Sequence, residues 1–120
     1  MVLKGKALGK EGERQAGLYL EKQGLVIIER NFRTRSGEID LVVRDKKELV
    51  FVEVKTRSGT DFGTALEAVH SRKCRQIVRV ASEYLLQNDG FDQPVRFDVI
   101  GILLGDNPQF EHIKNAFDAS

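Results

Sequence analysis

A chain of 120 residues has the length of one domain, and its 41% of hydrophobic residues supports a packed core and excludes intrinsic disorder. It has no apolar run near the roughly 18 residues of a membrane span, no signal-like apolar N-terminus, and a single cysteine, Cys74, which excludes disulfides and thiolate-rich zinc sites. The net charge is +1, but 17 basic and 11 acidic residues lie in 1–82, against 2 and 7 in 83–120. We expect one cytoplasmic domain over residues 1–120, without membrane contact.

The first half of the chain begins with a predicted helix over residues 8–23. Gly24 is a natural stop for this helix. A strand over 25–32 follows, and then a basic, flexible loop over 33–37 that contains Arg, Ser and Gly. The residues expected on one face of the helix are Leu8, Gly12, Ala16, Tyr19, Leu20 and Gln23.

The second half begins with a predicted hairpin, whose strands cover 38–44 and 48–56. A long helix over about 63–87, a strongly apolar strand over 95–104 and a short edge strand over 110–113 complete the chain. The helix should carry the chain across the sheet, so strand 95–104 should lie parallel to strand 48–56. We therefore predict an α/β fold with a mixed central sheet flanked by helices. The residues expected on one face of the long helix, three or four positions apart, are Leu66, Val69, Lys73, Ile77, Val80 and Tyr84.

Charged residues gather on one face of the predicted hairpin. A symmetric turn would set Asp40 opposite Glu53 and Glu38 opposite Lys55, with Cβ atoms about 5 Å apart. The hairpin would therefore hold two carboxylates and a lysine close together. Strand alternation assigns one face to Glu38, Asp40, Glu53 and Lys55, and the other face to Ile39, Leu41, Val52 and Val54.

Two carboxylates at that distance are destabilising unless a cation lies between them. Mg²⁺ prefers one or two carboxylates together with waters and phosphate oxygens. Asp40, Glu53 and the main-chain carbonyl of Val54 are therefore candidate ligands of Mg²⁺ or Mn²⁺. Such a metal lowers the pKa of a bound water and stabilises phosphate charge, and Lys55 can orient that water or offset charge in the transition state. The pattern predicts metal-dependent hydrolysis of a phosphodiester bond.

The segments Gly37-Glu38-Ile39-Asp40 and Glu53-Val54-Lys55 resemble the core motif of the PD-(D/E)xK, or restriction-endonuclease-like, superfamily, with Ile39 where the motif's name has proline. Nearly the whole chain resembles the bacterial YraN family of small nuclease-like proteins, itself similar to archaeal Holliday junction resolvases. The resemblance implies a restriction-endonuclease-like αβββαβ core and a Mg²⁺-dependent endonuclease acting on DNA, with branched, junction-like DNA as a candidate substrate. It is carried by Gly12-Glu13 with Ala16, Asn31-Phe32-Arg33, GEIDLV at 37–42, FVEVKTR at 51–57 and RFDVI at 96–100.

The same resemblance suggests a role for each site residue. Asp40 and Glu53 match the metal-binding carboxylates, and Lys55 matches the catalytic lysine. Glu13 matches a helix glutamate that completes the metal site in the resolvase-like branch, so it is both a catalytic and a metal-ligand candidate. Lys73 stands where related nucleases often place a polar helper.

The basic first part of the chain is typical of a surface that binds a polyanion, although charges separated in sequence also even out on a folded surface. Phosphate contacts are expected from Arg33, Arg35, Arg57 and Lys73. The alternative to a nuclease is a nucleic-acid-binding module with a relic nuclease site, whose affinity would fall steeply with salt. A homodimer would suit a two-stranded substrate.

Three further residues are expected to have structural roles or none. Asp98 lies in an apolar strand, where an unpaired charge is costly, so a partner such as Arg96 is expected. His70 and His112 show no spacing typical of metal ligands, and we interpret both as incidental.

Overall fold

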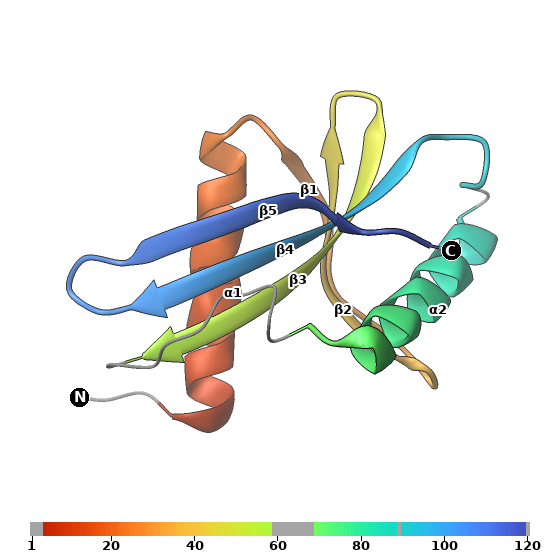
Figure 1. The fold of residues 1–120 in the computed structure, drawn as a ribbon. Helices are drawn as coiled ribbons and strands as arrows, with labels where there is room; N and C mark the ends of the chain where they lie inside the picture. Colours follow the sequence, from red (N-terminus) through yellow and green to blue (C-terminus); the bar gives the residue numbers. More distant parts are fainter. Residues whose placement is uncertain (1–3, 59–68, 89, 120) are drawn as a thin grey trace.

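The structure is a computed structural model that describes residues 4–58, 69–88 and 90–119 (Figure 1). The order of its elements confirms the predicted αβββαβ core and adds a full fifth strand. The elements are α1 (Gly5–Lys22), β1 (Val26–Thr34), β2 (Gly37–Asp45), β3 (Glu48–Ser58), α2 (Ser71–Gln87), β4 (Val95–Leu104) and β5 (Gln109–Phe117).

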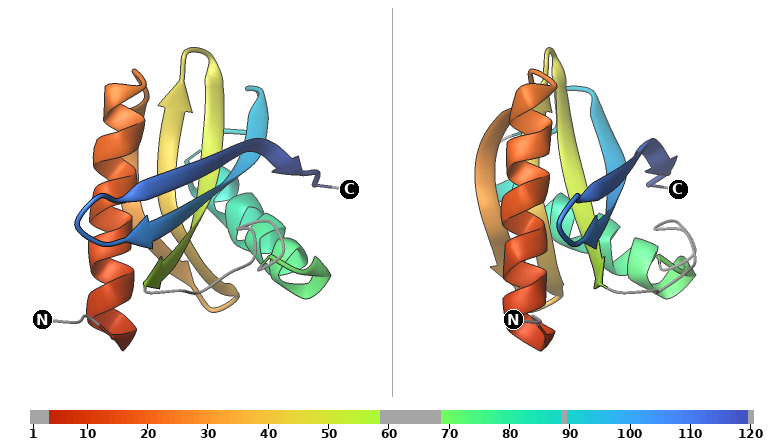
Figure 2. Two further views of the ribbon diagram at one scale, coloured as in Figure 1. Left: turned by 60° about the vertical axis from the view of Figure 1, so that its left-hand side comes forward. Right: turned by 90° about the vertical axis from the view of Figure 1, so that its left-hand side faces the viewer.

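The five strands form one mixed sheet in the order β1-β2-β3-β4-β5. Only β3 and β4 are parallel, and the other neighbours are antiparallel. The predicted parallel pairing of strands 48–56 and 95–104 is therefore confirmed. Figure 2 shows α1 and α2 on opposite sides of this twisted sheet.

Each face of the sheet has its own apolar core. On one face Ala16 and Leu20 of α1 pack with residues that include Val50 and Val52 of β3. On the other face the residues of α2 pack with a cluster that contains Phe51. In that cluster the ring of Tyr84 meets the rings of Phe32 and Phe51 edge-on, with centroids 5.1 and 5.6 Å away. Because side chains alternate along a strand, Glu53 of β3 shares the face of Phe51, on the side of α2.

Two glycines of α1 mark where the helix touches the sheet. A Cβ added at Gly12 would lie 2.7 Å from the Cβ of Thr56 in β3, which is closer than real Cβ atoms approach. A Cβ added at Gly17 would lie 2.7 Å from Nη1 of Arg30 in β1. Glycine costs a helix roughly 1 kcal/mol relative to alanine. Here that cost is offset by close packing of α1 on the sheet. Since Gly12 lies against Thr56, the next residue, Glu13, lies near the end of β3.

The predicted bounds of the first helix need correction at both ends. α1 begins at Gly5 rather than residue 8 and ends at Lys22. Gln23, predicted on the buried face, is instead an exposed C-cap. Gly24 stops the helix as predicted, with a φ of 92°. The main chain turns there, and the N–H of Leu25 donates to the carbonyl of Leu20.

The second helix begins later than predicted. α2 starts at Ser71, and Val69 and His70 precede it, so the prediction of a helix from residue 63 is wrong at these two positions. The remainder of that predicted start, including Leu66, lies outside the described residues. His70 has an extended conformation, and its Nδ1 accepts a hydrogen bond from the N–H of Lys73 at 3.4 Å. It is therefore an N-cap rather than an incidental histidine. No helix in the described ranges is long and apolar enough to span a bilayer.

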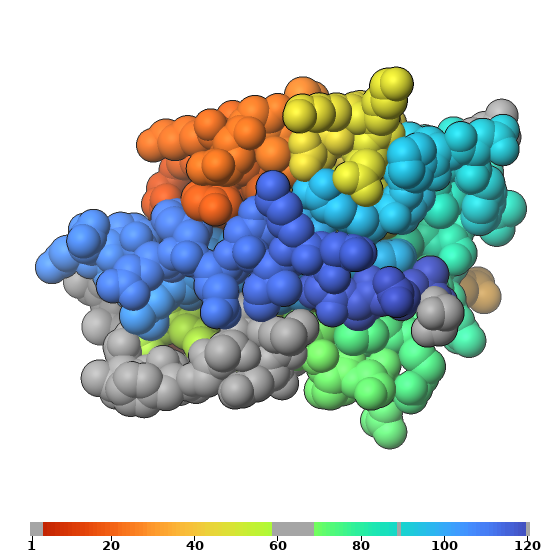
Figure 3. Space-filling model, turned by 45° about the horizontal axis from the view of Figure 1, so that its top comes forward, coloured from red at the N-terminus to blue at the C-terminus, as the bar shows by residue number. Residues whose placement is uncertain are grey.

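Two connections also differ from the predictions. Arg33 and Thr34 belong to β1, and only Arg35 and Ser36 form the turn to β2, so the expected flexible loop is a tight hairpin. β5 is longer than the predicted strand over 110–113, because it pairs with β4 along most of that strand's length. Figure 3 shows β5 crossing the surface beside the end of α1 and the β2–β3 turn.

Candidate metal centre

The candidate metal centre, called the metal centre below, lies where β2 leaves β3. The main-chain ladder between these strands has the predicted register and runs from Asp45↔Glu48 to Leu41↔Val52. Past this point the Oδ2 of Asp40 accepts a hydrogen bond from the main-chain N–H of Val54 at 2.8 Å. The prediction that Asp40 lies opposite Glu53 in the ladder is therefore wrong. The side chain of Asp40 instead takes the place of a main-chain acceptor.

The predicted alternation fails over one step of β2. Ile39 packs in the cluster beside α2, whereas Leu41 packs in the cluster beside α1, so the two do not share a face. The reason is that β2 parts from β3 here while it stays paired with β1 through Phe32↔Ile39. The strand reorients as it leaves, and this turns Asp40 towards the end of β3.

Asp40 and Glu53 lie side by side, close enough for a hydrogen bond between their carboxyl groups. Burial raises the pKa of Asp40 to about 8, and the negative charges of Glu53 and, more weakly, Glu13 add to the rise. The hydrogen bond from Val54 opposes it. The site therefore holds two acidic groups whose simultaneous ionisation is unfavourable without a cation.

Two lysines reach the second of these carboxylates. The side chain of Glu53 is only 5% exposed, and its Oε2 lies 3.4 Å from Nζ of Lys55 and 3.4 Å from Nζ of Lys73. Lys55 comes from β3 and Lys73 from α2, so the helix crossing brings a second cation to the site. The predicted pairing of Lys55 with Glu38 is wrong, because Lys55 turns to Glu53.

Asn31 connects the remaining glutamates. Its Nδ2 donates to Oε1 of Glu13 at 2.8 Å and to Oε1 of Glu38 at 3.0 Å. Glu38 also pairs with Nη2 of Arg33 at 3.3 Å. Asn31 has a φ of 52°, a left-handed conformation that asparagine tolerates better than most residues. No role in the site was predicted for Asn31 from the sequence. An asparagine inside a predicted strand was the available signal, because strands are depleted in it.

The donor set suits a hard divalent cation. In a strand the N–H and C=O of one residue point to the same side, so the carbonyl of Val54 points to the side of Asp40. Asp40, Glu53 and this carbonyl can hold one ion, leaving positions for water and phosphate, as Mg²⁺ prefers. Within the described ranges, no group of three or more His, Cys, Asp or Glu side chains lies close enough together to hold a metal ion, so the site offers two carboxylates and not three. Glu13 acts on Asp40 through its charge, and its role as a ligand stays a prediction.

The predicted phosphate contacts surround this centre unevenly. Arg33 is 73% exposed in its side chain, and Arg35 is exposed at the β1–β2 turn. Gln76 of α2 anchors that turn, because its Nε2 donates to the carbonyl of Ser36 at 2.9 Å. Arg57 is half-buried near the end of β3. The fourth predicted contact, Lys73, is the one that the fold draws directly to the metal centre.

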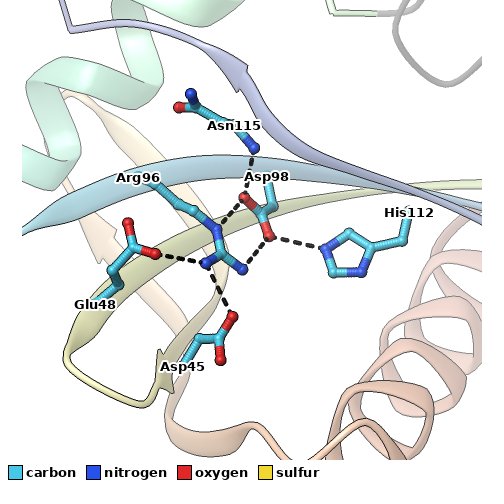
Figure 4. Close-up of polar contacts among 6 residues, drawn as sticks. All are labelled: Asp45, Glu48, Arg96, Asp98, His112 and Asn115. Carbon is cyan, nitrogen blue, oxygen red and sulfur yellow. Dashed lines mark hydrogen bonds and ion pairs between the residues drawn. The ribbon is translucent and has the colours of Figure 1, made fainter.

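A second polar cluster lies apart from the metal centre (Figure 4). Asp98 is fully buried, and its two oxygens accept hydrogen bonds from Arg96 at 2.9 and 3.1 Å, from the Asn115 N–H at 2.9 Å and from Nε2 of His112 at 2.8 Å. Burial alone would raise the pKa of Asp98, but the hydrogen bonds from His112, Arg96 and Asn115 outweigh it and hold that pKa below its usual range. The predicted Arg96–Asp98 pair is confirmed. His112, interpreted as incidental, is part of the same network.

Comparison with known proteins gives consistent matches along the chain. The family model described as "Uncharacterised protein family UPF0102" matches residues 12–102, a span that contains every residue of the metal centre. The UPF0102 protein of Geobacter metallireducens is 50% identical over 119 residues, which are 98% of each chain. That of Rhodococcus opacus is 47% identical over 92% of this chain and 96% of its own. Among solved structures, SfsA of Pyrococcus furiosus in complex with Ca²⁺ is similar with a TM-score of 0.35 and 15% identity, over 89% of this chain and 62% of that chain.

Proposed function

Because the chain belongs to the uncharacterised protein family UPF0102, as the resemblance to YraN predicted, we propose its function from its own site: divalent-metal-dependent hydrolysis of phosphodiester bonds in DNA. One observation carries the proposal. Two adjacent carboxylates, Asp40 and Glu53, lie at a strand end with two lysine amines 3.4 Å from the second. Carboxylates that repel each other and are flanked by amines are the arrangement that phosphoryl-transfer sites use.

The metal in this proposal is Mg²⁺ or Mn²⁺, held by Asp40, Glu53 and the carbonyl of Val54. When bound, it supplies a Lewis acid for the phosphate and lowers the pKa of a coordinated water. The protein holds the carboxylates in place beforehand. The Val54 N–H fixes one oxygen of Asp40 at 2.8 Å, and Lys73 fixes the orientation of Glu53 from the side of α2.

In this proposal Lys55 acts on the reacting groups. Its side chain is 29% exposed, so its amine is open to a ligand while it stays 3.4 Å from Glu53. From there the amine can donate to a phosphate oxygen or orient the attacking water, and it offsets the negative charge that develops on the phosphate. The side chain of Lys73 is 30% exposed, and it reaches Glu53 from α2 rather than from β3.

The surface beside the centre favours a nucleic acid as the substrate. Arg72, Arg75 and Arg79 are exposed on α2, and their spacing of three and four residues aligns them on one side of the helix. The Gln76–Ser36 hydrogen bond holds the turn that carries Arg35 against the same helix. These cations would follow a phosphate backbone towards the metal centre. Branched, junction-like DNA is the substrate class that the resemblance implies.

The exposed arginines also support the second candidate, a module that binds nucleic acid without cutting it. Such a protein would keep the arginine surface and would not depend on a metal. Its affinity would fall steeply as salt rises, because backbone contacts dominate. The two functions therefore differ in their dependence on Glu53.

A cleavage assay separates them. Labelled four-way junction, flap, single-stranded and duplex DNA are incubated with Mg²⁺, Mn²⁺ or EDTA. Wild type is compared with Glu53→Gln and with Glu21→Gln, a matched change at an exposed position of α1. We expect wild type and Glu21→Gln to cut only with metal, and Glu53→Gln to be slower by about a hundredfold or more. Equal cutting by all three proteins would exclude the site. Binding without cutting by all three would favour the second candidate.

A further inference from the structure

We propose that a pocket remote from the metal centre binds a phosphate-bearing ligand of nucleotide size. This inference goes beyond the proposed nuclease function and does not depend on it. The pocket, of about 850 Å³, lies between the end of α1, the β2–β3 turn and β5. These three segments meet on the face shown in Figure 3.

The pocket and the metal centre are on different faces of the sheet. Glu48, which lines the pocket, lies on the same face of β3 as Val50 and Val52, because the three residues are two positions apart. Val50 and Val52 pack against α1. Glu53 lies on the side of α2, where Lys73 reaches it. Glu53 is five positions beyond Glu48 on the strand, which is about 17 Å at about 3.3 Å per residue. A ligand of the pocket therefore does not touch the metal centre.

Three lysine amines give the pocket its charge. Lys46 and Lys47 come from the β2–β3 turn, and Lys114 comes from β5. All three are exposed, and none forms an ion pair with another residue in the described part of the chain. Their charge is available to an anion, and lysine amines are common phosphate donors.

The two acidic residues of the lining do not cancel this charge. Asp45 and Glu48 each lie 2.9 Å from Nη1 of Arg96, which is buried behind them (Figure 4). Arg96 also pairs with Asp98, so together with the three lysines four cations face three carboxylates, and the group has a net charge of +1. The three exposed lysines of the lining have no acidic partner of their own among the described residues.

His112 adds a fixed polar group. Its side chain is only 6% exposed and lines the pocket, and its Nε2 contacts Oδ2 of Asp98 at 2.8 Å. An ionised carboxylate can only accept hydrogen bonds, so Nε2 carries the proton and Nδ1 is the nitrogen available to a ligand. The ring of Tyr19 lies edge-on to the imidazole, with centroids 5.9 Å apart, and restricts its rotation. The buried network thus presents one imidazole nitrogen in a defined orientation.

The size of the pocket suits a ligand larger than a phosphate ion. A volume near 850 Å³ lies within the range of small-molecule sites and is much larger than one phosphate ion needs. The lysines would take the phosphate. Tyr19, whose ring also stacks on Phe110 with centroids 4.8 Å apart, and the amide of Gln23 line the remaining space. A nucleoside monophosphate, free or at the phosphorylated end of a strand, has this combination of groups.

Titration calorimetry with adenosine 5′-monophosphate tests the proposal. Wild type is compared with the double variant Lys47→Gln/Lys114→Gln and with Lys6→Gln/Lys10→Gln, which removes the same charge from exposed positions at the far end of α1. We expect the pocket variant to bind roughly tenfold more weakly or worse, and the control to bind like wild type. Lys47→Arg/Lys114→Arg, which keeps the charge, should retain most of the affinity. Adenosine, which lacks the phosphate, should bind at least roughly tenfold more weakly than the monophosphate.

Several outcomes would overturn the proposal. They are no saturable binding by wild type, equal affinity in wild type and the pocket variant, equal losses in both glutamine variants, or adenosine binding as tightly as its monophosphate. A 5′-phosphorylated oligonucleotide distinguishes the two sources of ligand. If a 5′-phosphate strengthens oligonucleotide binding in wild type and not in Lys47→Gln/Lys114→Gln, the pocket takes a strand end; if the 5′-phosphate has the same effect in both proteins, it takes a free nucleotide.

Discussion

The carboxylate of Asp40 replaces a strand partner of Val54, because its Oδ2 accepts the Val54 main-chain N–H at 2.8 Å just beyond the end of the β2–β3 ladder. The fold thereby satisfies a donor at the strand end and fixes a carboxylate beside the nearly buried Glu53. The same hydrogen bond directs the carbonyl of Val54 to this side. The end of the hairpin and the candidate metal centre are therefore one structural feature.

Without metal, the stability of the protein should fall as pH rises from about 4 to about 8. The pKa of Asp40 is raised to about 8 in the folded protein by burial and by the charge of Glu53, against about 3.9 in an unfolded chain. Between these values the folded protein keeps a proton that the unfolded chain loses, so raising the pH favours unfolding. A loss of several kcal/mol is expected, since the folded value lies about four pKa units above the unfolded one and each pKa unit corresponds to about 1.4 kcal/mol.

Urea denaturation in EDTA at several pH values measures this effect. Asp40→Asn removes the titrating group, so its stability should vary less over the same range, while Asp118→Asn, at an exposed position, should behave like wild type. Mn²⁺ should restore stability at high pH in wild type and not in Asp40→Asn. Parallel pH profiles for wild type and Asp40→Asn would show that Asp40 does not titrate in this range.

Replacing Asn31 should weaken metal binding through Glu13. The amide of Asn31 holds Glu13 at 2.8 Å, and the charge of Glu13 acts on Asp40. Asn31→Ala and Asn31→Gly both remove the amide, but only glycine accepts the φ of 52° without strain, so alanine should be less stable by about 1 kcal/mol. Calorimetry with Mn²⁺ should find both variants weaker than wild type by a similar factor. If the Mn²⁺ affinity of the glycine variant were instead close to that of wild type and only the less stable alanine variant bound weakly, Asn31 would matter through its backbone conformation and not through its amide.

The sequence was sufficient to predict the parts of the site that follow from local pattern. Alternation along β3 set Glu53 and Lys55 on one face, and the hairpin brought Asp40 near them. The place where β2 leaves β3 was not predictable, because strand twist and the competing pairing with β1 decide it. For that reason two predictions were wrong: that Glu38 lies opposite Lys55, and that Ile39 shares a face with Leu41.

Contacts between distant elements were the other limit. His112 meets Asp98 only because β5 pairs with β4 along most of its length, and this pairing was underestimated as a short edge strand. The N-cap role of His70 depends on where α2 starts, and helical periodicity does not fix a boundary. The pair of Arg96 and Asp98 was predictable, because residues two positions apart share a face where a strand runs regularly, as β4 does over these residues beside β3.

Gly12→Ala should destabilise the protein by about 1–3 kcal/mol, as overpacking typically does. The new Cβ would meet the side chain of Thr56, whose Cβ lies 2.7 Å away, so α1 would have to shift from β3. Thr56→Ala should recover part of the loss by removing Oγ1 and Cγ2. Gly9→Ala is the matched control, because nothing lies within 4 Å of a Cβ there, and it should be neutral or stabilising. Thermal denaturation of the four proteins checks the ranking, and equal effects at residues 9 and 12 would contradict the close approach.

Asp98→Asn should cost about 3–5 kcal/mol near neutral pH, the range for removing one partner of a buried ion pair. The change removes the negative charge that pairs with Arg96. The new NH₂ group of the asparagine would also face N–H donors of Arg96 or Asn115 that now donate to a carboxylate oxygen of Asp98. Urea denaturation measures the loss, and Asp106→Asn, at an exposed position, is the control. Because its hydrogen bonds hold the pKa of Asp98 below its usual range in spite of burial, its stabilisation is present above the unfolded pKa of about 3.9 and is lost as pH falls through the folded value. The gap between wild type and Asp98→Asn should therefore narrow in acid, and a gap that stayed constant would show that the charge of Asp98 does not stabilise the fold.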